Sequence, residues 1–219
     1  MQVAEAVTPP FVSRVIARQQ SPAWKRAFDI VMSVILLAIL SPVFALVALW
    51  IKLVSPGAIF FRQNRVGHGG FDFRIAKFRT MHIDSEATAR HREYLKSLEK
   101  SEPLAKPEFN SRLIPGGSFL RKFSIDELPQ LWNVLIGEMS LVGPRPDVFS
   151  LDDYETPFEL RRFEVQPGIT GLWQVSGKNS LTYDQMIELD VRYVDDLSWS
   201  LDALIVAKTF RVLLSQDNN

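Results

Sequence analysis

The stretch that decides the fold is AFDIVMSVILLAILSPVFALVALWI, residues 27–51. It holds 25 residues and a single charged side chain, that of Asp29. A helix of about 20 apolar residues is long enough to cross the hydrocarbon core of a bilayer. The stretch is therefore predicted to enter a membrane. What remains to be decided is whether it crosses the bilayer or turns back.

A serine–proline pair, Ser41 and Pro42, interrupts the run near its middle. Proline removes one backbone hydrogen bond and clashes with the carbonyl group four residues earlier, so the helix is expected to kink or break there. The arm before the pair, residues 27–40, has 14 residues. Its length as a helix is about 21 Å, which is short for a hydrocarbon core of about 30 Å.

Basic residues flank the run on both sides: Arg14, Arg18, Lys25 and Arg26 before it, and Lys52, Arg62 and Arg65 after it. A spanning helix usually has its Lys and Arg biased to one side. Symmetric flanks favour a re-entrant hairpin whose two ends return to the cytoplasmic face. A kinked spanning helix stays open as the alternative, because membranes tolerate such kinks. A signal peptide is not expected, since the run is too long and no cleavage site follows it.

The neutral net charge of the 219-residue chain hides an asymmetry. Residues 1–80 hold 10 Lys/Arg against 3 Asp/Glu, and residues 81–219 hold 15 against 22. An excess of +7 in the first part points to an anionic partner, such as a membrane surface or a phosphorylated substrate. The absence of cysteine excludes a disulfide scaffold. Before the apolar run, residues 11–20 place apolar side chains on one helical face, as in an interfacial amphipathic helix or a packed one.

Residues 58–81 are predicted to form two strands around a glycine-rich turn at 67–70. The turn does not match a dinucleotide-binding fingerprint, because Asp72 stands where the last glycine is needed. Five cations lie on these strands: Arg62, Arg65, Arg74, Lys77 and Arg79. Such cations either line solvated strand faces or bind phosphate.

Two adjacent acids, Asp126 and Glu127, lie in FLRKFSIDELPQLW, residues 119–132. Ser124 and Glu127 fit a capping box, which predicts a helix from about 124 to 136 with Gly137 as its end. Taken alone, these residues favour capping over catalysis. Further on, Pro144 and Pro146 bracket Arg145 and are expected to hold it in place before any ligand arrives.

The other segments predict a charged helix over 82–100, a loop over 165–180, and two helices separated near Ser198. The second of these helices is very apolar and suits either a core or a membrane surface. The three histidines show no metal-binding spacing, and the sequence contains no G-x-S-x-G elbow, P-loop or Asp-x-Asp motif.

From Lys25 to its end the chain resembles the bacterial sugar transferases, the monotopic phosphoglycosyl transferases that prime glycan assembly on polyprenyl phosphate. The matching pieces are KRAFDI, the apolar run with its LSP, FRQNRVG, KFRTM, GSFLRKFSIDELPQLWNVLIGEMSLVGPRP, PGITGLWQVSG and LDVRYV. The block from Leu120 to Pro146 is highly specific. The short length is similar to that of exopolysaccharide-priming members.

The resemblance implies transfer of a hexose-1-phosphate from a UDP-hexose to undecaprenyl phosphate with release of UMP, and a need for Mg²⁺. It implies that Asp126 is the nucleophile and a metal ligand, and that Glu127 is the neighbouring base. A carboxylate that forms a covalent phosphosugar intermediate would split the transfer into two steps. The expected substrate-binding cations are Lys77, Arg79, Arg121 and Arg145, since a diphosphate repels a carboxylate that has no compensating charge.

The predicted fold is therefore α+β. It consists of a membrane-embedded re-entrant helix-break-helix hairpin (25–55, broken at Ser41 and Pro42) and a small, mostly helical cytoplasmic catalytic domain (56–219) with a short β-hairpin and interfacial amphipathic helices. Residues 1–24 form an N-terminal amphipathic or flexible segment. The expected location is the bacterial inner membrane, against its anionic cytoplasmic leaflet. No nucleic-acid partner is expected, and a homodimer is compatible with the sequence.

Two other functions compete with this one. A membrane-anchored scaffold with a degenerate site would release no nucleotide. An ordinary glycosyltransferase would release UDP instead of UMP, and usually shows an Asp-x-Asp motif.

Overall fold

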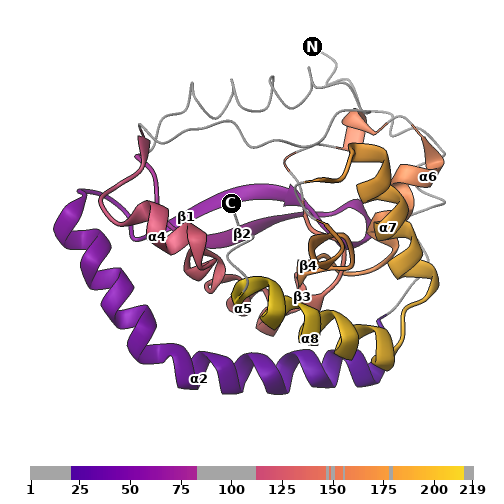
Figure 1. Ribbon diagram of the computed structural model, residues 1–219, viewed down its shortest axis with the longest axis horizontal. Coiled ribbons are helices and arrows are strands. Elements are labelled where there is room, and N and C mark those ends of the chain that lie inside the picture. The colour runs from indigo at the N-terminus through magenta and orange to yellow at the C-terminus, as the bar shows by residue number, and fades with distance from the viewer. Residues whose placement is uncertain are drawn as a thin grey trace, which may run out of the picture.

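The computed structural model describes residues 21–82, 112–146, 148, 151–154, 156–177 and 180–214. These residues form a mixed helical and β structure in which one long apolar helix, α2 (Ala23–Val54), runs along one side of a body formed by the other elements (Figure 1). The coarse α+β prediction is confirmed. Residues 1–20 of the predicted N-terminal segment (1–24) and residues 83–100 of the predicted charged helix (82–100) lie outside the described residues.

Helix α2 is continuous through Pro42 and visibly bent in Figure 1. The Ser41 hydroxyl donates to the carbonyl of Ala38, 2.8 Å away, which is the carbonyl that Pro42 leaves without its helical partner. Only 11% of the most apolar part of α2 is buried. A core helix of that composition would be mostly covered, so α2 has the length and the exposure of a membrane helix.

Both ends of α2 are attached to the same body. Near the N-terminus, Arg26 donates to the carbonyls of Val134 and Leu135, at 2.6 and 2.8 Å. Near the C-terminus, the indole of Trp50 donates to the carbonyl of Pro115, at 2.9 Å. The exposed apolar side chains of α2 include Val31, Val34, Ile39, Leu46 and Leu53.

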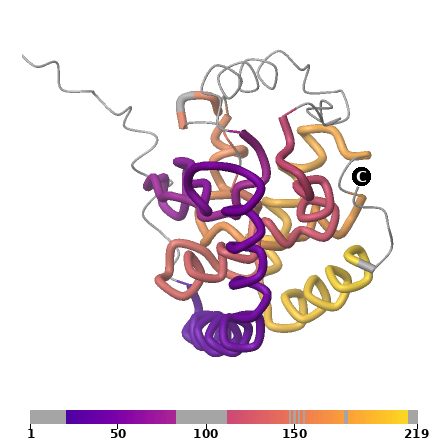
Figure 2. Tube along the Cα trace, turned by 90° about the vertical axis from the view of Figure 1, so that its left-hand side faces the viewer, coloured from indigo at the N-terminus to yellow at the C-terminus, as the bar shows by residue number. Residues whose placement is uncertain are grey.

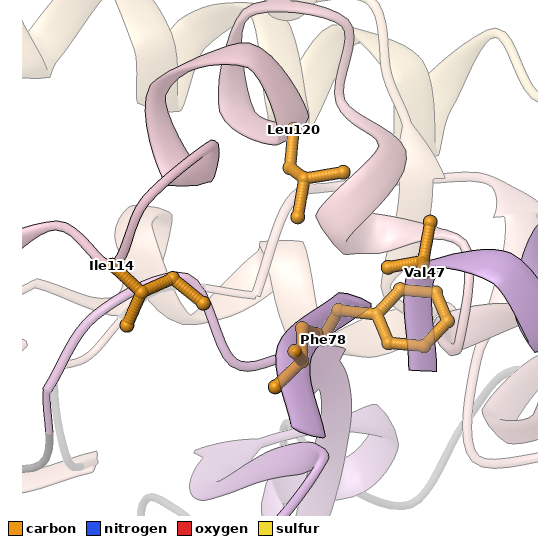
Figure 3. Close-up of a cluster of buried hydrophobic side chains, with 5 residues drawn as sticks. Val47, Phe78, Ile114 and Leu120 are labelled. Carbon is orange, nitrogen blue, oxygen red and sulfur yellow. The ribbon is translucent and has the colours of Figure 1, made fainter. Parts of the chain in front are cut away.

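A hydrophobic cluster fixes the C-terminal arm of α2. Val47 and Ile51 pack there with Phe78, Ile114 and Leu120, and all five are buried (Figure 3). Burial of each such side chain stabilises the fold by about 1.5–3 kcal/mol. The cluster therefore joins the membrane-type helix to the strands and to α4 (Gly117–Lys122).

The predicted β-hairpin is confirmed. Strands β1 (Phe60–Val66) and β2 (Asp72–Phe78) pair antiparallel around a turn that contains the short 3-10 helix η1 (His68–Gly70). Phe73 and Ile75 of β2 are buried and alternate with the exposed Asp72 and Arg74. This alternation places Lys77 on the face of Phe73 and Ile75, and Arg74 on the other face.

The single helix predicted from about 124 to 136 is wrong. The chain instead forms a 3-10 turn, η3 (Ile125–Glu127), and a separate helix, α5 (Gln130–Ile136). Ser124 makes no side-chain capping bond and has φ 54, in the left-handed region. Pro129 separates the two pieces because it has no N–H to continue the ladder. The predicted end at Gly137 is confirmed, with φ 94.

A second, parallel sheet was not predicted. It consists of β3 (Ser140–Val142) and β4 (Gly168–Thr170), and β4 lies inside the stretch predicted as a loop. Three residues are too few for a visible period of two, so no sequence pattern indicates this strand. Four short helices also lie in this part of the chain: η4 (Leu151–Asp153), α6 (Pro157–Leu160), η5 (Arg161–Glu164) and η6 (Trp173–Val175).

The two predicted C-terminal helices are confirmed as α7 (Tyr183–Asp195) and α8 (Trp199–Leu214). Thr182 and Gln185 form a capping box at the start of α7. Helix α8 lies beside the N-terminal arm of α2, which is seen end-on in Figure 2. Trp199 touches Trp24 and Phe28 edge to face, with ring centroids 5.8 and 5.0 Å apart.

Candidate active site

The two acids lie in the tight turn between α4 and α5. Ser124 adopts a left-handed conformation, which is uncommon for a residue other than glycine, and η3 follows it directly. The amide of Glu127 donates to the carbonyl of Ser124 at 3.1 Å, closing the turn. Strained backbone of this kind often occurs at functional sites. Capping of an α-helix does not explain the pair, because α5 begins only after Pro129.

Glu127 is bonded to two cations that come from distant parts of the chain. Its Oε1 accepts a hydrogen bond from Lys77 Nζ at 2.8 Å. Both of its carboxylate oxygens accept from the Arg145 guanidinium, with the Nη1–Oε2 bond at 3.1 Å. Burial alone would raise the pKa of Glu127, but the charges of Arg145 and Lys77 hold it well below its ordinary value.

Asp126 differs from its neighbour in that it accepts no hydrogen bond from any residue the structure describes. Burial raises the pKa of Asp126 to about 6, and the adjacent charge of Glu127 acts in the same direction. The cations Lys77, Arg121 and Arg145 oppose this rise. The pair thus contains one acid that is fixed by ion pairs and one whose carboxylate is available to a ligand.

The backbone around Arg145 is held at several points. Gly143 donates its N–H to Thr170 O at 2.9 Å, and Pro144 O accepts from Gly168 N at 2.8 Å. The buried guanidinium of Arg162 donates to the carbonyl of Arg145, also at 2.8 Å. These bonds fix the backbone of Arg145 before any ligand binds, as we expected from the two flanking prolines.

Arg162 was not predicted as part of the site. It is 2% exposed and pairs with Asp190 at 2.8 Å. In the sequence it is one of two adjacent arginines in a helical segment. No spacing rule distinguishes the buried Arg162 from its neighbour Arg161, which is one-third exposed and pairs with Asp195.

Arg121 and Arg79 have different positions relative to the acids. Arg121 lies in α4, just before the turn, and its charge lowers the pKa of Asp126. Arg79 is buried, and its guanidinium donates to the carbonyls of Ser55 and Pro56, at 2.9 and 2.7 Å. Because those carbonyls directly follow the last residue of α2, Arg79 holds the segment that leaves this helix. We therefore place Arg79 outside the acidic cluster.

The five cations of the hairpin, for which phosphate binding and solvated strand faces were the two alternatives, are not gathered in one place. Only Lys77 reaches the acids. Arg62 and Arg74 line a shallow groove with Trp132 and Ile136 of α5, on the strand face away from Lys77. Arg65 donates to Pro146 O at 3.4 Å and so lies against the segment that carries Arg145.

The residues available for a metal ion are few. Among the described residues no group of three or more His, Cys, Asp or Glu side chains is placed to hold one. The free carboxylate of Asp126 nevertheless suits Mg²⁺, which proteins commonly hold by one or two carboxylates together with substrate phosphates. The residues present therefore fit a metal that arrives with a phosphorylated substrate.

The long exposed apolar helix and the acidic pair among fixed cations point to a membrane-associated protein that binds phosphate groups. The chain belongs to the bacterial sugar transferase family, whose model matches residues 20–216.

Curated relatives support the same family. The chain is 41% identical over 196 residues to the exopolysaccharide production protein ExoY of Sinorhizobium fredii, covering 84% of this chain and 83% of that protein. It is 42% identical over 204 residues to the UDP-glucose:undecaprenyl-phosphate glucose-1-phosphate transferase of Caulobacter vibrioides, covering 89% and 71%. It is 41% identical over 212 residues to the undecaprenyl-phosphate galactose phosphotransferase of Salmonella typhimurium, covering 92% of this chain and 43% of that longer protein.

Proposed function

We propose that the protein transfers a hexose-1-phosphate from a UDP-hexose to undecaprenyl phosphate and releases UMP, as a priming step of exopolysaccharide assembly. The observation that carries the proposal is the asymmetry of the acidic pair. Glu127 is neutralised by hydrogen bonds from two cations, whereas the carboxylate of Asp126 accepts no hydrogen bond from the described residues. The names of the Caulobacter vibrioides and Salmonella typhimurium relatives, which specify sugar phosphate transferred to undecaprenyl phosphate, support the substrate class.

In the first step, a carboxylate oxygen of Asp126 attacks the phosphorus that bears the sugar. The bond from this phosphorus to the bridging oxygen of the diphosphate breaks, and UMP leaves with that oxygen. A mixed anhydride between Asp126 and the sugar phosphate remains. In the second step, an oxygen of the lipid phosphate attacks the same phosphorus, which releases the Asp126 carboxylate and forms the lipid diphosphate sugar.

Glu127 has a different role in this proposal from the base that the resemblance implied. An efficient general base has a pKa near the working pH. The pKa of Glu127 is held well below its ordinary value by Arg145 and Lys77, despite burial. We therefore assign Glu127 to fixing these two cations beside Asp126, where they can face the diphosphate.

Mg²⁺ fits this scheme through the free carboxylate of Asp126. When bound, the ion would neutralise charge on the diphosphate and orient the leaving group. The side chains of Lys77, Arg121 and Arg145 surround the acid with positive charge and reduce the repulsion between a carboxylate and an anionic substrate.

The proposed topology is re-entrant, with the catalytic body at the cytoplasmic face of the inner membrane. Support comes from the two ends of α2, which are bonded to one body through Arg26 and Trp50. A spanning helix would place its two ends at opposite surfaces of a hydrocarbon core about 30 Å thick, so a body bonded to both ends would have to lie inside the bilayer. At the bend, the Ser41 hydroxyl donates to the carbonyl that Pro42 leaves without its helical partner. The bend lets both basic flanks stay at one anionic surface.

The reaction is tested with a panel of UDP-sugars and undecaprenyl phosphate in nanodiscs, scored by the nucleotide released. The panel includes glucose and galactose, which appear in the names of the Caulobacter vibrioides and Salmonella typhimurium relatives. It also includes N-acetylgalactosamine, which appears in the name of a relative from Aeromonas hydrophila of 41% identity. UMP release that depends on the lipid phosphate is expected. UDP release would identify an ordinary glycosyltransferase, and the absence of any nucleotide across the panel would favour a scaffold.

The pH dependence of the reaction should follow Asp126. The attacking form is the carboxylate, so kcat/KM should fall about tenfold per pH unit below the pKa of about 6. Glu127→Gln removes a negative neighbour that raises the pKa of Asp126. The acid limb of the profile should therefore move to lower pH in that variant. A limb that stays in place, or moves to higher pH, would contradict the assignment.

The topology is tested through the break in α2. Replacing Ser41 and Pro42 with Ala-Ala restores helix propensity, so part of the population should straighten and cross the membrane. The native chain has no cysteine, so single cysteines replacing Glu5 or Lys100 report sidedness in intact cells. Both should be shielded from an impermeant reagent in the parent, and Glu5→Cys should become labelled in the Ala-Ala variant. Labelling at residue 5 but not at 100 in the parent would show a spanning helix.

A further inference from the structure

Three polar residues form a buried stripe on the N-terminal arm of α2. Lys25, Asp29 and Ser33 follow each other at intervals of four, so they lie on one helical face. They are 1%, 3% and 0% exposed, whereas Val31 and Val34 on the same arm are 55% and 50% exposed. An ionisable residue in a membrane-type helix is costly and usually has a functional reason.

The carboxylate of Asp29 binds the outer edge of strand β3. Its Oδ1 accepts from the backbone N–H of Leu141 at 2.9 Å and from the hydroxyl of Ser140 at 3.1 Å. The other edge of β3 is paired with β4, through Ser140 with Gly168 and Val142 with Thr170. Asp29 therefore takes the place of a neighbouring strand and satisfies a half-buried backbone donor that the pairing with β4 leaves open.

Strand β3 leads directly to the active site. Only Val142, Gly143 and Pro144 separate Leu141 from Arg145, and the prolines on both sides of Arg145 stiffen the connection. Arg145 in turn makes two bonds to Glu127, beside Asp126. A shift of β3 at Leu141 is thus transmitted along a short, stiff segment to the guanidinium.

We infer that Asp29 is a positioning residue of the active site, which sets Arg145 through β3 and makes the site depend on docking of the membrane helix. The inference rests on the proposed function, because it takes Arg145 as part of the catalytic cluster. In this inference Asp29, the one acid of the apolar run, affects the active site without touching any of its residues.

A purely structural role is the competing explanation. The same arm of α2 is held by a buried ion pair of Lys25 and Asp202 at 2.6 Å, and Asp202 also accepts from the Tyr193 hydroxyl at 2.7 Å. If Asp29 only helped this attachment, its loss would reduce activity whatever residue stood at 145. If it acts through Arg145, its loss should have no further effect once Arg145 is gone.

The experiment is a double-mutant cycle on the full chain in nanodiscs. Asp29→Leu leaves the N–H of Leu141 unpaired and should lower kcat/KM at least tenfold, as expected for loss of hydrogen bonds to a charged group. In the Arg145→Ala background the same change should lower kcat/KM less than about twofold. Asp29→Asn keeps an oxygen for Leu141 and should restore most of the activity. Consumption of the UDP-sugar is measured, so the comparison holds whichever nucleotide leaves.

Ser33→Ala is the matched control. Ser33 lies one turn further on the same buried face, and its hydroxyl has no hydrogen-bond partner in the described structure. Its removal should leave kcat/KM unchanged in both backgrounds. If Asp29→Leu is not recovered in the membrane, Ser140→Ala replaces it, because it removes one of the two bonds to Asp29 from the side of β3.

Two outcomes would overturn the inference. One is an equal loss on Asp29→Leu in the parent and in the Arg145→Ala background, since that result would mean that Asp29 acts independently of Arg145. The other is an Arg145→Ala enzyme of full activity. Release of UMP or UDP by the parent tests the proposed function separately.

Discussion

Asp126→Asn should abolish sugar-phosphate transfer, with a loss in kcat of about 10³-fold or more, as expected when a nucleophile is removed. The amide keeps the shape of the carboxylate, so the turn and its fold should survive. The Asp126 side chain makes no hydrogen bond to any described residue, so the change breaks none and removes only its charge interactions with Lys77, Arg121 and Arg145. The measurement is nucleotide release from UDP-sugar and undecaprenyl phosphate.

The two-step scheme also predicts a trapped intermediate. When the acceptor lipid is withheld, a sugar phosphate should accumulate on Asp126, visible by mass spectrometry of the intact chain and of its peptides. The adduct should be missing in Asp126→Asn and present in Ser33→Ala. UMP production without any adduct in the parent would count against covalent catalysis. Substantial activity in Asp126→Asn would rule it out at this residue.

The sequence predicted well those elements whose patterns are long. The β-hairpin has alternating apolar residues and a glycine turn, and α7 and α8 have full helical periods. The end of α5 at Gly137 follows from the ease with which glycine adopts a positive φ. These features are local, so no tertiary contact is needed to predict them.

The sequence predicted less well those features that tertiary contacts create. Strands β3 and β4 are three residues each, and they pair across an intervening segment of more than 20 residues. The capping box at Ser124 is complete in sequence, yet the chain forms a left-handed residue and a 3-10 turn there. The strained turn places both acids toward Lys77 and Arg145, which a regular helix start would not require.

The candidate site shows the same division. The motifs identify the acids, Lys77 and Arg145, and the structure brings them together. Arg79 belongs to a matching motif as well, but its guanidinium holds the end of α2. A motif identifies residues that matter to a family without telling which of them face the substrate. Deciding between the two roles requires the contacts of each side chain.

Arg145→Ala should cause the second largest loss of activity. The change removes two bonds to Glu127 and a positive charge beside Asp126. We expect a loss in kcat/KM of about 1.5–3 kcal/mol, the range for hydrogen bonds to charged groups, which is about 10- to 150-fold. Arg145→Lys should recover only part of it, because lysine keeps the charge but not the two-pronged geometry. Lys77→Ala should lose a comparable amount.

Arg74→Ala is the matched control, since Arg74 lies on the same strand as Lys77 with its side chain on the other face. It should change kcat/KM little. Unchanged kinetics in both Arg145→Ala and Lys77→Ala would place the diphosphate elsewhere.

The pH profile separates loss of a binding contact from loss of charge at Asp126. The charge of Arg145 lowers the pKa of Asp126, so its removal should raise that pKa above about 6. The acid limb of kcat/KM should then move to higher pH in Arg145→Ala, opposite to its movement in Glu127→Gln. Two charge changes of opposite sign that shift the limb in opposite directions would identify the titrating group as Asp126. Movement in the same direction in both variants would mean that another group controls the limb.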